Sequence, residues 1–156
     1  MPEDLLQRLI AARNFNQGFA TVEYLASAFV DLDFHSLPPA AAAGRETATL
    51  ARIGMPDEIA MRHRPPHFAH IFSGGGYAAG YYSYMWSEVL DADAFEAFEE
   101  TGDIFDPATA KRLQETIYAA GGSRDPADAY KAFRGRLPSP DALLRKRGFA
   151  ARAVTN

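Results

Sequence analysis

The apolar positions in the first part of the chain recur at the spacing of helices. Residues 3–13 have leucine and isoleucine on one face, which predicts an amphipathic helix. Residues 14–18 contain three side-chain amides and a glycine, which favour caps and turns. The next predicted helix, 19–34, has apolar residues over more of its surface than one stripe along a single face, so it should be the more deeply buried of the two. Its only charged residues are Glu23, Asp31 and Asp33.

Proline, glycine and N-cap residues divide the rest of the chain into short segments. In the last third, Asp91 is a candidate N-cap, and Asp106, Asp125 and Ser139 each precede a proline at the first helical position. No segment alternates strictly between apolar and polar residues, so we predict no strand. The predicted helices are 40–53, a single turn at 57–61, 77–90, 91–100, 107–120 (with Leu113, Ile117 and Tyr118 facing inward), 126–133 and 140–147.

These elements predict an all-α fold, and we expect residues 1–156 to form a single α-helical domain. A hydrophobic content of 47% and an aromatic content of 12% exclude global disorder. The net charge of −4 argues against nucleic acid and anionic membrane surfaces as partners. The chain has no cysteine, no apolar run long enough to span a bilayer and no signal-peptide pattern. We therefore expect a cytoplasmic protein.

The stretch from Arg64 to Leu90 has the most unusual composition. It contains the only tryptophan, four of the seven tyrosines and a run of three glycines. The predicted helix from Tyr77 would place Tyr84, seven residues later, on the same face. Two phenols and the imidazole of His70 in one cleft could donate to an oxyanion and hold a peptide backbone. The same tyrosines could also be buried core residues.

Other candidate sites in this region have weaker patterns. His63, His67 and His70 could suggest a metal, but Pro65 and Pro66 prevent a helical i, i+4 pair, and the chain has no H-E-x-x-H. The three glycines lack the lysine and serine or threonine of a phosphate-binding P-loop. For Asn14, Asn16 and Gln17 we favour helix capping over ligand binding. For Arg62 and Arg64 we favour a solvated basic turn over a carboxylate site.

Three segments together resemble a known family. HFAHIFSGGGYAAGYYSYMWSEVLDADAF, RNFNQGFATVEYLASAFVDLDFHS and FRGRLPSPDALLRKRGF resemble the C-terminal part of the thimet-oligopeptidase-like (M3) zinc metallopeptidases. The resemblance is strongest to the branch with bacterial peptidyl-dipeptidase and oligopeptidase A. It extends over essentially the whole chain and implies a helical segment of a larger metallopeptidase.

The resemblance also implies roles for individual residues. By motif, Tyr77 and Tyr84 match the phenols that stabilise the tetrahedral intermediate and bind the substrate backbone. His70 matches a histidine that supports substrate binding, and Gly74, Gly75 and Gly76 match a glycine loop that contacts substrate. The family's zinc ligands and its catalytic glutamate lie in an upstream segment that has no counterpart here. We therefore expect this chain alone to bind no zinc.

These inferences lead to one favoured function and one alternative. The favoured function is the C-terminal part of a zinc-dependent oligopeptidase of the peptidyl-dipeptidase type, which hydrolyses short peptides. The isolated chain should be inactive without the N-terminal portion of the enzyme, and it should self-associate through exposed apolar surface. The alternative is a free-standing, non-catalytic helical domain that binds peptides or a partner protein.

Overall fold

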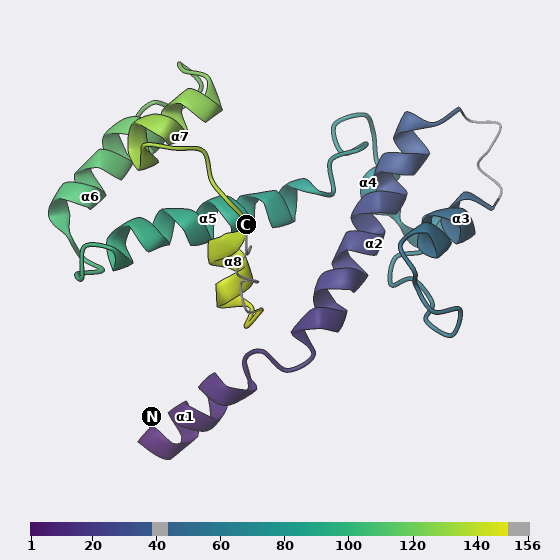
Figure 1. The fold of residues 1–156 in the computed structure, drawn as a ribbon. Coiled ribbons are helices and arrows are strands. Elements are labelled where there is room, and N and C mark those ends of the chain that lie inside the picture. The colour runs from purple at the N-terminus through teal and green to yellow at the C-terminus, as the bar shows by residue number, and fades with distance from the viewer. Residues whose placement is uncertain (39–43, 150–156) are drawn as a thin grey trace, which may run out of the picture. The chain divides into compact units, whose positions relative to one another are not determined.

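The computed structural model describes residues 1–38 and 44–149. The chain divides into two compact units, Met1–Tyr84 (unit 1) and Met85–Asn156 (unit 2). The described residues form helices and connecting turns without any strand, so the predicted all-α class is confirmed (Figure 1). The single domain over residues 1–156 stays a prediction. Within the described ranges, no helix is both long and apolar enough to cross a membrane.

Unit 1 is built around its longest helix, α2. The core contains Val30 of α2 together with Met61, Phe68 and Ile71 from the segments that follow α3. Arg45, which is buried, donates to the backbone carbonyls of Asp33 (2.9 Å) and Pro38 (2.6 Å) and so caps the end of α2. The elements of unit 1 are α1 (Glu3–Ala12), α2 (Gln17–Ser36), α3 (Arg45–Arg52), the 3₁₀ turn η2 (Pro65–His67) and α4 (Ala69–Phe72).

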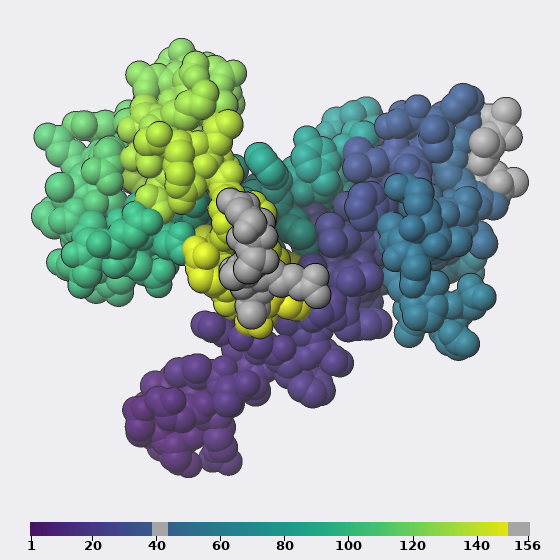
Figure 2. Space-filling view, in the orientation of Figure 1, coloured from purple at the N-terminus to yellow at the C-terminus, as the bar shows by residue number. Residues whose placement is uncertain are grey.

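Helix α1 is amphipathic, as its sequence predicts, yet the structure buries none of its ten residues. The atoms of α1 are open to solvent in Figure 2. Within the described part of unit 1, no other segment covers its apolar face or several large side chains after it. The exposed apolar residues of this region are Leu5, Leu6, Leu9, Ile10, Phe15, Phe19 and Val22.

Unit 2 packs α7 and α8 against the long helix α5. Its core contains Val89, Ala92, Ala142 and Leu143. Two of the predicted caps are confirmed: the Asp106 carboxylate accepts from the Thr109 amide at 2.7 Å, and that of Asp125 accepts from the Ala127 amide at 2.9 Å. The other two are wrong, because Pro140 and not Ser139 is the N-cap of α8, and Asp91 lies inside α5. The elements are α5 (Ser83–Glu99), α6 (Pro107–Leu113), the π-helical turn η3 (Gln114–Tyr118), α7 (Pro126–Arg134) and α8 (Asp141–Lys146).

Two helix predictions around the central stretch are wrong. The helix predicted from Tyr77 begins only at Ser83, because Ala79 adopts a left-handed conformation (φ 56°) that no α-helix contains. The separate helix predicted from Asp91 does not exist, because α5 continues without a break to Glu99. No glycine or proline lies within α5, so nothing interrupts it.

Smaller corrections concern three other segments. Residues 57–61 form a non-helical turn instead of a helical one. Tyr118, predicted to face inward, is exposed. The predicted start of the helix 40–53 lies outside the described residues, and the described part of that helix is α3.

Candidate functional site

The three residues that the sequence singles out come from three adjacent segments and all lie in unit 1, which ends at Tyr84, within the first turn of α5. His70 lies in the single turn of α4, Tyr77 in the turn after the glycines, and Tyr84 in the first turn of α5. The connection between Tyr77 and Tyr84 is a non-helical loop, so these two residues do not share a helix face. Both residues instead lie near His70, because the loop folds back beside α4.

His70 lies between the two phenols. Its Nε2 is 3.3 Å from the Tyr84 hydroxyl, and its ring centroid is 4.8 Å from that of Tyr77 and 5.9 Å from that of Tyr84. Both phenols are about half exposed, at 53% for Tyr77 and 51% for Tyr84. Neither phenol belongs to the buried core of unit 1 among the described residues. The site is an open polar surface with two hydroxyls and an imidazole.

Tyr81 is at the centre of the aromatic cluster, although the sequence pattern gave it no role. Its ring stacks on Tyr24 at 5.3 Å and meets Phe68 edge-on at 4.9 Å. It also lies 5.7 Å from His70 and 5.6 Å from Tyr84. Burial raises the pKa of the Tyr81 phenol, which therefore stays protonated. Tyr81 connects the core of unit 1 to the exposed rings of the site.

Asp31 of α2 is a second residue that sequence reasoning did not assign to the site. The side chain is completely buried, and its two oxygens accept hydrogen bonds from the backbone amides of Ala79 (3.0 Å) and Tyr81 (2.8 Å). The Tyr24 hydroxyl donates to the carbonyl of Tyr81. A signal for Asp31 was present in the sequence, since a charge within a mostly apolar helix needs a partner.

The glycines form the exposed edge of the site. Gly74 has φ of 114°, a conformation that favours glycine, whereas Gly75 and Gly76 have no such requirement. Among the described residues, no atom outside the adjacent chain lies within 4 Å of a Cβ placed at any of the three. The glycines therefore leave space above the backbone next to Tyr77.

The described residues do not fit a metal centre. No group of three or more histidine, cysteine, aspartate or glutamate side chains in the described ranges could hold an ion. The ring of His63 instead stacks on Phe68 at 5.1 Å.

The other polar candidates are the two arginines and the amide residues around the start of α2. Arg62 and Arg64 pair with Glu23 (3.5 Å) and Glu46 (2.9 Å), so each contacts a carboxylate of its own unit. Asn16 occupies the N-cap position of α2, where its side chain makes no capping hydrogen bond to the described residues.

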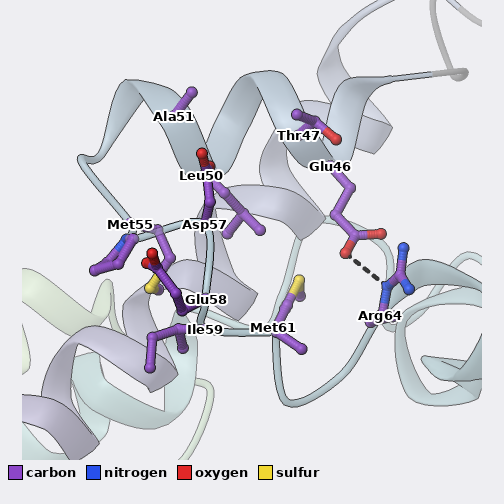
Figure 3. A pocket seen from close by; sticks show the side chains of 12 residues that line it. Glu46, Thr47, Leu50, Ala51, Met55, Asp57, Glu58, Ile59, Met61 and Arg64 are labelled. Carbon is purple, nitrogen blue, oxygen red and sulfur yellow. Dashed lines mark hydrogen bonds and ion pairs between the residues drawn. The ribbon is translucent and has the colours of Figure 1, made fainter.

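A pocket of about 310 Å³ lies elsewhere in unit 1, between α3 and the segment that follows it (Figure 3). The Glu46–Arg64 ion pair crosses one side of it, and Leu50, Met55 and Ile59 form apolar parts of its wall. None of its twelve lining residues is one of the predicted site residues. The predicted site and this pocket therefore lie on different residues of unit 1.

Comparison with known proteins identifies the family of the chain. Residues 1–149 match Peptidase family M3. The chain is 40% identical to oligopeptidase A of Haemophilus influenzae over 152 residues, which cover 95% of this chain and 22% of that protein. It is 42% identical over 164 residues to a probable cytosolic oligopeptidase A of Arabidopsis thaliana, and this match covers 97% of this chain and 22% of that protein. It is 38% identical over 154 residues to dipeptidyl carboxypeptidase of Salmonella typhimurium, and this match covers 95% of this chain and 22% of that protein. The chain thus spans about a fifth of the length of these relatives, and it belongs to peptidase family M3.

Proposed function

We propose that this chain is the part of an M3 oligopeptidase that binds the backbone of short peptides and stabilises the transition state of their hydrolysis. The observation that supports this most directly is the grouping of His70, Tyr77 and Tyr84 on an exposed surface. The relatives are named as an oligopeptidase and a dipeptidyl carboxypeptidase, which is consistent with short peptides as substrates, including release of C-terminal dipeptides.

The phenols have the chemistry that this role requires. When a peptide carbonyl becomes tetrahedral, its oxygen gains negative charge, and a hydrogen-bond donor placed there lowers the barrier. A Tyr84 or Tyr77 hydroxyl can donate to that oxygen without losing its proton. His70, 3.3 Å from the Tyr84 hydroxyl, orients that hydroxyl or bonds to the substrate backbone. Gly74, Gly75 and Gly76 leave room for a peptide to pass close to the loop.

The proposal divides the enzyme between this chain and the rest of the polypeptide. M3 peptidases in general depend on zinc, and the described residues of this chain do not fit a zinc site. We therefore place the metal and the activated water in the remaining four fifths of the protein, judged by the length of the relatives. The chain alone should have no activity, and the apolar face of α1 should make it self-associate.

Single Tyr-to-Phe substitutions in the full-length peptidase test this function. Tyr84→Phe and Tyr77→Phe keep the ring and remove the hydroxyl, so each should lower kcat by roughly 10²–10³ with little change in KM. The matched control is Tyr82→Phe, because Tyr82 is exposed in the same loop but lies outside the cluster around His70. The measurement is steady-state cleavage of a short fluorogenic peptide.

Two results would contradict the proposal. The site assignment is wrong if all three variants keep wild-type kcat. Binding of peptides by the full-length protein without any turnover would instead favour the alternative function, a non-catalytic peptide-binding domain.

A further inference from the structure

The carboxylate of Asp31 faces the loop between the two site tyrosines. Its Oδ1 is 3.0 Å from the Ala79 amide nitrogen, and its Oδ2 is 2.8 Å from the Tyr81 amide nitrogen. The Nδ1 atom of His35, one turn later on α2, lies 2.8 Å from Oδ1. Asp31 is completely buried, so these contacts replace the water that a carboxylate would otherwise bind.

The bonded segment has an unfavourable backbone conformation. Ala79 has φ of 56°, in the left-handed region that residues with a Cβ seldom adopt. Such a conformation persists only when its surroundings determine it strongly. Here the Asp31 carboxylate accepts hydrogen bonds from the amides of Ala79 and Tyr81, on either side of Gly80. The Tyr24 hydroxyl donates to the Tyr81 carbonyl. Helix α2 therefore fixes the path of the chain from residue 79 to residue 81.

We propose that Asp31 is a positioning residue that sets the placement of the Tyr77 and Tyr84 hydroxyls. This inference rests on the proposed function of those hydroxyls. The bonded segment begins two residues after Tyr77 and ends three residues before Tyr84, so a change in its path displaces both. A Cβ added at any of the three glycines before Tyr77 would meet no atom within 4 Å among the described residues outside the adjacent chain, so no side chain packs over that part of the loop. Asp31 thus acts on the site through the backbone and touches no substrate.

Amide hydrogen exchange of the chain itself tests the structural half of the inference. In Asp31→Asn one carboxylate oxygen becomes an NH₂ group, which cannot accept, so at least one of the amides of Ala79 and Tyr81 loses its bond to residue 31. If it is the Ala79 amide, only its longer contact with His35 Nδ1, at 3.4 Å, remains. Exchange at that amide should accelerate about tenfold or more, whereas the Thr109 amide, bound to Asp106, should not change. Unchanged exchange at both amides would overturn the inference.

A double-mutant cycle in the full-length peptidase tests the functional half. Asp31→Asn should lower kcat about 10- to 100-fold with little change in KM, because small misplacement of a catalytic donor costs that much. In a Tyr84→Phe background the further loss from Asp31→Asn should be much smaller, since the group that it positions is already absent. Asp33→Asn is the matched control: Asp33 is on the same helix and bonds to Thr49 and Arg52, not to the loop.

The outcomes separate this inference from the proposed function. If Tyr84→Phe keeps wild-type kcat, the proposed function is wrong, and the positioning role is overturned with it. If Tyr84→Phe loses turnover and Asp31→Asn does not, only the positioning role is overturned. An equal loss from Asp31→Asn in both backgrounds also overturns it, because a general loss of folded enzyme would act independently of Tyr84. If Asp31→Asn does not fold, Tyr24→Phe, which removes one bond to Tyr81 and keeps the ring, should show the same coupling to Tyr84 at a smaller size.

Discussion

Asp31 in unit 1 and Asp93 in unit 2 are both completely buried, but their carboxylates bind different kinds of partner. Asp31 accepts from two backbone amides of a loop. Asp93 accepts from the side chains of Arg136 (2.6 Å) and Tyr130 (2.6 Å), and the Nε atom of Arg134 lies 3.4 Å away. Burial raises the pKa of the Tyr130 phenol and its bond to Asp93 raises it further, so Tyr130 remains a donor.

The difference indicates what each carboxylate does. The partners of Asp93 are long side chains from α7 and the segment after it, so they fix how these elements pack on α5. The partners of Asp31 are amides of a loop that lies beside exposed phenols, so they fix a backbone path. Loss of an ion pair between buried side chains affects mainly stability. Loss of the loop contacts should affect mainly the geometry of the site.

The largest effect on stability should follow from Asp93→Ala. This change removes the only completely buried carboxylate that contacts Arg134 among the described residues, and it leaves this 8% exposed side chain with the more exposed Glu100 and Glu96. Removal of one member of a buried pair costs about 3–5 kcal/mol. Asp31→Ala should cost less, about 1–3 kcal/mol, because it leaves neutral amides without an acceptor. Urea unfolding followed by the fluorescence of Trp86, the only tryptophan, measures the effect in unit 2.

The Tyr130→Phe variant is a reference for the loss of a single hydrogen bond to Asp93. It removes one donor from Asp93 and leaves both arginines, so its cost should be about 1–2 kcal/mol. If Asp31→Ala destabilises the protein as much as Asp93→Ala does, the distinction between a packing carboxylate and a positioning carboxylate is wrong.

The helices of unit 2 show which part of the fold could be predicted from sequence. The Asp106-Pro107 and Asp125-Pro126 pairs predict the starts of α6 and α7 correctly, because a cap and the proline after it act within one turn of the chain. The all-α class was predictable for the same reason, since helical spacing is a local pattern. The family motif also selected His70, Tyr77 and Tyr84, which the structure brings together.

The contacts that shape the site could not be predicted, because they join residues far apart in sequence. Asp31 and Ala79 are 48 positions apart, and no local pattern indicates which amide a buried carboxylate will find. The same contact explains the incorrect helix from Tyr77. Residues 77–82 contain only one glycine and no proline, so local propensity favours a helix. The bonds from Asp31 stabilise a turn there instead.

Acid should weaken unit 2 through Glu100, at the surface end of the Asp93 network. Hydrogen bonds from Arg134, at 2.7 and 2.6 Å, lower the pKa of Glu100 below its usual value of 4.5. A carboxyl with a lowered folded pKa stabilises the protein above its unfolded pKa and loses that contribution as pH falls through the folded value. Glu100 is 55% exposed, so solvent limits the contribution to about 0.5–1 kcal/mol.

Glu100→Gln should therefore flatten the acid side of the stability profile of unit 2. Urea unfolding at pH 7 and at successively lower pH, followed by Trp86 fluorescence, measures the slope. The matched variant in unit 1 is Asp33→Asn: burial raises the pKa of Asp33, but the hydrogen bonds from Thr49 and Arg52 together with the positive charges of Arg52 and Arg45 lower it by more. An acid limb that stays as steep in Glu100→Gln as in the wild type would show that the Arg134 pair adds nothing to stability.

The smallest change in stability should come from Gly75→Ala. Gly75 precedes Tyr77, whereas the amides that bond to Asp31 follow it. No atom of the described residues outside the adjacent chain lies within 4 Å of the new Cβ, and φ at Gly75 does not require glycine. The free energy of unfolding should therefore stay within about 0.5 kcal/mol of wild type.

If the open backbone serves to admit a peptide, the same methyl group should raise KM in the full-length peptidase, because it removes binding that the ground state and the transition state share. Gly74→Ala is the contrast, since φ of 114° should make it destabilising whatever the substrate does. Unchanged stability together with unchanged KM in Gly75→Ala would show that the exposed glycines do not contact substrate, and it would restrict the site to the rings around His70.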